Sequence, residues 1–109
     1  MMRFDNVTIK GSGSYLPETV LPNAELEQNA DTTDAWIYKA LGIKERRVIS
    51  GEDVSDLGVK AAQRALKDAG VDREDIDMII VATSSPERIS PATACTIHKK
   101  LGIKKNVPS

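Results

Sequence analysis

The sequence predicts an α/β domain in which strands and helices alternate. Its 109 residues suffice for one small domain. A segment with a regular apolar stripe at helical spacing, residues 55–69, precedes a continuous aliphatic run at residues 78–83. A run of this kind is typical of a strand that is buried on both faces of a parallel sheet. Because helical and strand patterns alternate along the chain, we expect layered α/β architecture.

In the first third of the chain, the sequence predicts one strand and two short helices. Residues 7–11 alternate like a strand and lead into a glycine-containing turn. We expect Asn23 to cap a short helix. Residues 31–33 offer a second cap, and the helix that follows them should end at Gly42.

In the rest of the chain, the sequence predicts a strand, a helix, the aliphatic strand and a last helix. Residues 46–49 favour a short strand, and Ser55 begins a helix that Gly70 ends. The apolar stripe of that helix consists of Val59, Ala62, Ala65, Leu66 and Ala69. Ser90–Pro91 predicts the cap of the last helix, with proline at its first position, and Gly102 predicts its end.

Composition excludes several classes of function. Fifteen Lys and Arg nearly balance sixteen Asp and Glu, and no basic stripe contains interleaved aromatic residues, so we expect no nucleic-acid binding. No segment approaches the length of a transmembrane helix, so we expect no membrane association. The single cysteine excludes an internal disulfide and a cysteine-based metal site. It also suits a reducing compartment, and we therefore expect a cytoplasmic protein with no metal.

Cys95 and His98, the only cysteine and the only histidine, stand three residues apart and share one helix face. Thiol nucleophile catalysis uses such a pair, because the imidazole accepts the thiol proton. Cys95 lies about one turn beyond Pro91, however, where the helix dipole does little to stabilise a thiolate. Free cysteine is also commonly buried. We therefore favour a structural, packing role for both residues.

Trp36 is the only tryptophan and permits two interpretations. A lone tryptophan is usually a core anchor. Its place in a polar first turn, next to Thr32, Thr33 and Asp34, also allows a partly exposed ring that stacks on a base.

Two further motifs have simple structural explanations. The turn at residues 11–14 lacks the third glycine and the helix that a dinucleotide site needs. Lys99–Lys100 and Lys104–Lys105 flank a helix end, where the dipole favours cations, and a solvated face explains them.

Several blocks of the sequence together resemble the N-terminal portion of β-ketoacyl-acyl carrier protein synthase III. They are residues 9–18, Asn23, 31–37, 42–46, 82–85, 90–95 and 101–103. The blocks occur at compatible spacing over nearly the whole chain. The resemblance implies a thiolase-like fold, of which residues 1–109 form the N-terminal segment of the first half, with its βαβαβ layers incomplete.

The same resemblance implies an acyltransferase that condenses an acyl-coenzyme A or acyl-carrier donor with malonyl-acyl carrier protein, the step that starts fatty acid synthesis. In that family coenzyme A thioester is a substrate, no cofactor is bound permanently, and the enzyme is normally a homodimer. The family's nucleophilic cysteine, histidine and asparagine would follow Ser109, so this segment should be inactive alone. Cys95 does not match the nucleophile, and Cys95 and His98 keep structural roles.

The resemblance also implies substrate contacts. The tryptophan that matches Trp36 stacks on the adenine of coenzyme A, and the threonine that matches Thr32 lies nearby. Ser90 matches a loop position where some short-chain enzymes place an aromatic that reaches across the dimer into the acyl pocket, so serine predicts a larger pocket. Ala40–Leu41 stands where the family usually has Arg-Thr. Because Lys39 points elsewhere on the helix, this departure weakens the predicted binding of the nucleotide phosphates.

Two alternatives stay open. Ala40–Leu41 is compatible with a same-fold acyltransferase of secondary metabolism that uses another acceptor. A standalone, non-catalytic module of 109 residues would instead bind an acyl carrier or a second subunit. We rank this module lower, because an open βα unit would expose an apolar strand edge and helix face, and we expect the chain to continue beyond Ser109.

Overall fold

The computed structural model describes residues 6–109, which form two compact units. Unit 1 combines the N-terminal segment up to Tyr15 with Asp53–Ser109, and unit 2 is Leu16–Glu52. Residues 1–5 lie outside the described part of the chain. None of the helices in residues 6–109 is long and apolar enough to cross a membrane.

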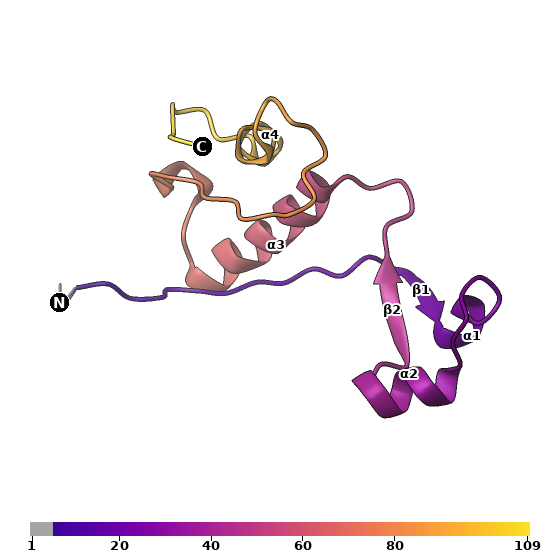
Figure 1. Ribbon diagram of the computed structural model, residues 1–109. Coiled ribbons are helices and arrows are strands. Elements are labelled where there is room, and N and C mark those ends of the chain that lie inside the picture. The colour runs from indigo at the N-terminus through magenta and orange to yellow at the C-terminus, as the bar shows by residue number, and fades with distance from the viewer. Residues whose placement is uncertain (1–5) are drawn as a thin grey trace, which may run out of the picture. The chain divides into compact units, whose positions relative to one another are not determined.

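In the described residues of unit 1, the regular structure consists of two α-helices and one short 3-10 helix (Figure 1). They are α3 (Val54–Ala69), η1 (Arg73–Asp75) and α4 (Thr93–Leu101). At the start of α3 the Asp56 carboxylate accepts a hydrogen bond from the Asp53 backbone N–H, at 2.9 Å. This contact satisfies a donor that the first helical turn leaves free. Gly70 and Gly102 end α3 and α4 as the sequence predicts.

The contact between α3 and α4 is aliphatic and close. Ile97, Leu101 and Ile103 are buried at its centre. Half-buried side chains pack around them, namely Val59, Ala62, Ile76, Ile79, Val81 and Val107. A Cβ atom on Gly58 would lie 2.6 Å from Ile97 Cδ1, so the missing side chain lets α4 approach α3. The predicted apolar stripe of α3 therefore supplies part of this packing face.

The strand predicted at residues 78–83 is wrong for the part of the chain that the structure describes. The segment is extended but joins no ladder, and the one backbone bond there runs from Ile79 N–H to Pro108 O, at 3.0 Å. Met78 and Ile80 are 58% and 83% exposed, whereas Ile79 and Val81 are half-buried. The aliphatic run therefore buries one face, whereas a strand in a parallel sheet has both faces covered by packed helices.

The strand predicted at residues 7–11 is also absent, and the segment packs on α3 instead. A Cβ atom on Gly13 would lie 2.4 Å from both the Ala61 carbonyl oxygen and the Ala65 backbone nitrogen. Arg64 Nη1 donates to the Ser14 carbonyl at 2.7 Å. The glycines of this turn therefore serve close packing of the backbone on a helix.

The last helix begins two residues later than Ser90–Pro91 predicts. Ala92 is its N-cap residue, and the Ala92 carbonyl accepts the backbone N–H groups of Cys95 and Thr96. Ala92 itself has extended ψ of 146°, so residues 90–92 still belong to the loop. The proline lies before the helix and is not its first residue.

Unit 2 pairs two short strands and adds two short helices (Figure 1). Its elements are β1 (Thr19–Pro22), α1 (Asn23–Leu26), α2 (Asp34–Leu41) and β2 (Glu45–Val48). The strands are antiparallel, with Thr19 opposite Val48 and Pro22 opposite Glu45. α2 and β2 were predicted from the sequence. β1 was not, because four residues ending in proline give little strand signal.

Candidate functional site

An open hollow in unit 2 brings together the residues predicted to contact a ligand. We call it the ligand hollow; Asp31, Thr32, Thr33 and Trp36 line its volume of about 340 Å³. Trp36 is 60% exposed. A core anchor would be buried, so the structure favours the interpretation of Trp36 as an accessible ring.

The first turn of α2 fixes the backbone beneath this ring. Thr33 is the N-cap residue of α2, and its Oγ1 accepts a hydrogen bond from the Trp36 backbone N–H at 3.2 Å. The neighbouring Thr32 Oγ1 is buried and has no hydrogen-bond partner within residues 6–109. An unpaired buried hydroxyl costs about 1–3 kcal/mol. A ligand atom that bonds to Thr32 would remove that cost.

No cation among residues 6–109 lines the ligand hollow. Asp31 is acidic, and the other three lining residues are uncharged. Ala40 and Leu41 are both exposed on α2 and offer no charge. The hollow can therefore stack a planar ring, but its own residues give a phosphate no positive partner.

Asn23 is the most deeply buried polar side chain of unit 2, at 1% exposure. Its Nδ2 donates to Asp34 Oδ1 at 2.7 Å and to the Ile43 carbonyl at 2.8 Å. Its Oδ1 accepts from Arg46 Nη2 at 3.1 Å. We call Asn23, Asp34, Arg46 and the Ile43 carbonyl the Asn23 cluster.

The predicted capping role of Asn23 is wrong. Pro22 is the N-cap residue of α1, and Asn23 is the first residue of the helix. The Asn23 side chain makes its bonds across unit 2 and none of them caps α1. A cap and a long-range amide cannot be told apart by sequence, because both place asparagine at a helix start.

Ser90 lies in the exposed loop that precedes α4. A hollow of about 260 Å³ beside this loop is lined by Val81, Thr83, Pro86, Arg88, Ile89, Ala92, Thr93 and Ala94. Ser90 is not among those lining residues. Its predicted role in an acyl pocket stays a prediction.

Cys95 and His98 do not pair with each other in the structure. Cys95 Sγ donates to the Ser109 carbonyl over 3.8 Å, and His98 Nε2 lies 3.2 Å from the Lys105 carbonyl oxygen. Cys95 is exposed, contrary to the buried position that we expected. The buried face of α4 is formed by Thr93, Ala94, Ile97 and Leu101. A structural role for Cys95 and His98 stays a prediction.

Sequence reasoning missed a polar cluster in unit 1. Ser55 is fully buried, its Oγ donates to Glu87 Oε2 at 2.7 Å, and it accepts from Lys100 Nζ at 2.7 Å. Lys100 also contacts Asp56 Oδ1 at 2.7 Å. We call Ser55, Asp56, Glu87 and Lys100 the charged cluster. Lys100 is exposed, as a solvated face predicts, but no local signal reveals its hydrogen bonds, because its partners lie 44 and 45 positions away.

The charged cluster holds its members in their ionised forms. The Ser55 hydroxyl bond lowers the pKa of Glu87, and the Lys100 bond lowers the pKa of Asp56. The Asp56 bond in turn raises the pKa of Lys100. The ionised cluster joins the start of α3, the loop before α4 and α4 itself.

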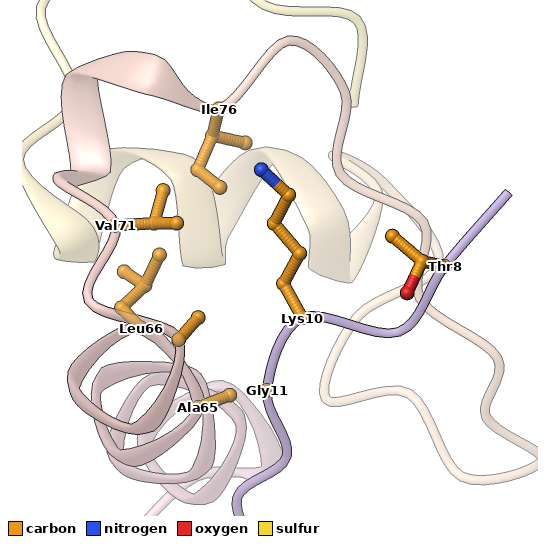
Figure 2. Close-up of a pocket in the computed structure, with 8 residues that line it drawn as sticks. Thr8, Lys10, Gly11, Ala65, Leu66, Val71 and Ile76 are labelled. Carbon is orange, nitrogen blue, oxygen red and sulfur yellow. The ribbon is translucent and has the colours of Figure 1, made fainter. Parts of the chain in front are cut away.

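A second hollow, in unit 1, is unlike the ligand hollow. Figure 2 shows aliphatic side chains of α3 and of the segment after it facing the extended N-terminal segment, with the Lys10 amine near Ile76. Its volume is about 330 Å³, and it is lined by Thr8, Lys10, Gly11, Ala65, Leu66, Ala69, Val71 and Ile76. Specific small-molecule sites combine apolar walls with several converging polar groups, which this lining lacks. Within residues 6–109, no three His, Cys, Asp or Glu gather as a metal site.

Comparison with curated proteins finds relatives with one shared name. The chain is 47% identical over 100 residues to β-ketoacyl-[acyl-carrier-protein] synthase III of Clostridium acetobutylicum, covering 92% of this chain and 31% of that protein. It is 52% identical over 98 residues to the synthase III of Campylobacter jejuni, covering 88% and 30%. The chain thus spans about a third of the length of these relatives. No family model matches it.

Solved structures give the same result. The 3-oxoacyl-[acyl-carrier-protein] synthase III of Aquifex aeolicus superposes with a TM-score of 0.86 at 41% identity, over 92% of this chain and 32% of that one. The priming β-ketosynthase of the R1128 polyketide pathway superposes with a TM-score of 0.83 at 35% identity, over 88% and 29%. The superposed residues therefore correspond to about a third of each of these proteins.

Proposed function

We propose that this chain, a homologue of part of the β-ketoacyl-acyl carrier protein synthase III proteins, supplies the donor-recognition segment of a condensing acyltransferase. The resemblance predicted from the sequence is confirmed by identities near 50% to proteins of that name. The predicted fold class, α/β and part of a thiolase-like fold, is confirmed by the structural relatives. Residues 1–109 are then the N-terminal segment of the first thiolase-like half.

The proposed reaction condenses an acyl-coenzyme A or acyl-carrier donor with malonyl-acyl carrier protein and starts fatty acid synthesis. Coenzyme A thioester enters as substrate, and acyl carrier protein is the partner that the relatives' names specify. We assign the nucleophilic cysteine to a part of the enzyme outside these residues, because the Cys95 thiol bonds to the Ser109 carbonyl and does not pair with His98. We further propose a cytoplasmic homodimer without a permanent cofactor.

The accessible ring of Trp36 is the observation that carries this proposal. We assign the adenine of coenzyme A to its face, with the buried Thr32 hydroxyl as the adjacent hydrogen-bonding group. Stacking of a base on an aromatic side chain contributes about 1–3 kcal/mol. Because no cation lines the ligand hollow, we expect the phosphates to add little, and the donor to bind loosely.

Trp36→Ala tests the proposal. We expect the variant to weaken binding of coenzyme A by about 5- to 150-fold, the equivalent of one lost stacking contact. Isothermal titration calorimetry of the 109-residue chain measures the dissociation constant of coenzyme A. This method does not depend on tryptophan fluorescence, so it also works for the variant. Pantetheine, which lacks the nucleotide, should bind weakly to both proteins.

Tyr38→Ala is the matched control for Trp36→Ala. Tyr38 is 51% exposed on the same helix but does not line the ligand hollow. We expect its removal to change the affinity for coenzyme A by less than about twofold. Equal losses in the two variants, or no loss in Trp36→Ala, would contradict the assignment of the adenine to Trp36.

We also propose that Ser90 leaves room for donors longer than acetyl. In the enzyme that contains this segment, hexanoyl- or octanoyl-coenzyme A should turn over faster than acetyl-coenzyme A. Ser90→Phe should fill that space and lower kcat/KM for octanoyl-coenzyme A about tenfold relative to acetyl-coenzyme A. Steady-state rates with the three donors check this, and a wild-type preference for acetyl would refute it.

A second candidate is a same-fold acyltransferase of secondary metabolism. The absence of a cation from the lining of the ligand hollow favours it, and so does the likeness to a priming β-ketosynthase of polyketide biosynthesis. An acceptor screen of the condensing enzyme separates the two. Product formed with malonyl-acyl carrier protein of fatty acid synthesis supports the leading candidate.

A further inference from the structure

We propose that Asn23 is a positioning residue for the ligand hollow. Its buried amide fixes α2, and through α2 it fixes Trp36 and Thr32 in the arrangement that receives the ligand. The inference rests on the proposed function, since the ligand hollow is assigned to coenzyme A. Asn23 is not among the residues that line the hollow, so its effect on binding is indirect.

The side-chain amide of Asn23 bonds to both ends of α2. One Nδ2 hydrogen goes to Asp34, the first residue of α2, and the other goes to the carbonyl of Ile43, just after its C-cap residue Gly42. The two donors of a single amide therefore hold both ends of an eight-residue helix. α2 cannot tilt or slide along its axis without lengthening one of these bonds.

The start of α2 is held by two hydrogen bonds of Asp34. The Asp34 carboxylate accepts from Asn23, and the Asp34 backbone N–H donates to the Glu27 carboxylate. Trp36 is two residues further along the same turn. The backbone of Trp36 therefore closely follows Asp34, a residue that is held by hydrogen bonds of both its side chain and its main chain.

The hydrogen bonds at position 23 specifically require an amide. Asn23 must donate twice and also accept from Arg46 Nη2. Aspartate has the same shape and keeps the acceptor for Arg46, but it donates nothing and would face the Asp34 carboxylate and the Ile43 carbonyl. Asn23→Asp therefore changes the hydrogen bonds at α2 while leaving the volume of the side chain almost unchanged.

The test uses the fluorescence of Trp36 to report on the ligand hollow. Trp36 is the only tryptophan, so its fluorescence emission and anisotropy report on this position alone. In the 109-residue chain, with folding checked by circular dichroism, we expect Asn23→Asp to raise the Kd for coenzyme A about tenfold. The anisotropy of Trp36 should fall in the same variant.

A rescue variant and a stability control separate positioning from general destabilisation. The double variant Asn23→Asp with Asp34→Asn restores a donor–acceptor pair, and it should recover part of the affinity and of the anisotropy. Ile37→Val removes one buried methylene-sized group from α2 without altering the amide bonds. It should lower stability and leave both the Kd and the anisotropy unchanged.

The outcomes are distinct. A folded Asn23→Asp protein with wild-type Kd and anisotropy overturns the inference, as does an equal loss in Ile37→Val. If Asn23→Asp does not fold, Asn23→Ser, which keeps one smaller donor, is judged by the same two measurements. If the wild-type chain binds no coenzyme A, the proposed function fails, whereas an anisotropy change confined to the Asn23 variants still supports the positioning role.

Discussion

The two units of this chain are held together by different kinds of interior. In unit 1, Ile97, Leu101 and Ile103 are buried aliphatic side chains, and α3 and α4 pack through them. In unit 2, Ile37 is a buried aliphatic side chain and Asn23 has a buried amide that bonds to three segments.

This difference has a consequence for function. Aliphatic contacts are non-directional, and their contribution depends mainly on the area that they bury. Hydrogen bonds of a buried amide weaken steeply with angle and distance, so they specify one arrangement. The ligand hollow lies in unit 2, whose interior contains these directional hydrogen bonds. An exposed ring such as Trp36 needs hydrogen bonds of this kind to fix its position.

Unit 1 also has a polar element, but it has a different role. The charged cluster connects the loop before α4 to the starts and ends of helices, and its ionised members remain partly accessible. The Asn23 cluster instead uses a neutral amide at its centre. The stability that the charged cluster contributes therefore depends on pH through the ionisation of its members. The contribution of the Asn23 cluster depends instead on the two hydrogen-bond donors of the amide.

The largest expected effect is on the packing of unit 1. Gly13→Ala would place a methyl group 2.4 Å from backbone atoms of α3, which have no freedom to move aside. We expect a loss of stability of about 1–3 kcal/mol or more, as for other overpacked sites. Chemical denaturation followed by circular dichroism measures the change in free energy of unfolding.

Gly58→Ala sharpens that prediction as a matched control. Its methyl group would meet Ile97 Cδ1 at 2.6 Å, which is the end of a side chain that can change rotamer. The cost should therefore be smaller than for Gly13→Ala. If the two variants lose the same stability, close backbone packing on α3 is not what the glycine at position 13 provides.

A smaller effect is expected from the charged cluster. Because the pKa values of Glu87 and Asp56 are lowered in the folded chain, their contribution is complete above their ordinary pKa values and is lost as the pH falls through the folded ones. The raised pKa of Lys100 adds a contribution that is lost at alkaline pH. Unfolding curves from pH 7 to pH 3 should therefore show a progressive loss of stability.

Glu87→Gln separates the cluster from general acid denaturation. The amide can still accept from the Ser55 hydroxyl but carries no charge, so the variant should be slightly less stable at pH 7 and lose less on acidification. A pH dependence identical to wild type would show that Glu87 does not contribute as an anion.

The sequence predicted those features that depend on neighbouring residues. Thr33 and Gly42 delimit α2, and the polar first turn around Trp36 allowed an exposed ring beside the alternative of a core anchor, because capping and turn chemistry act over a few residues. The strand at 78–83 failed for the opposite reason. Strand pairing depends on a distant partner, and the aliphatic run alone does not say whether one is present.

The polar clusters escaped prediction for a related reason. Asn23 at a helix start has the sequence pattern of a cap, although its side chain bonds to residues 11, 20 and 23 positions away. Ser55 and Lys100 are still further apart in sequence, and each alone resembles an ordinary helix residue. Only a tertiary structure brings such side chains together.

These separations also bear on the order in which contacts form. The entropic cost of closing a loop rises with its length, by about 0.6 kcal/mol for each doubling. The Asn23 cluster closes loops of 11 to 23 residues, and the charged cluster closes loops of 32 to 45 residues. The Asn23 cluster can therefore assemble at a lower entropic cost, whereas the bond between Ser55 and Lys100 forms only once α4 lies against α3.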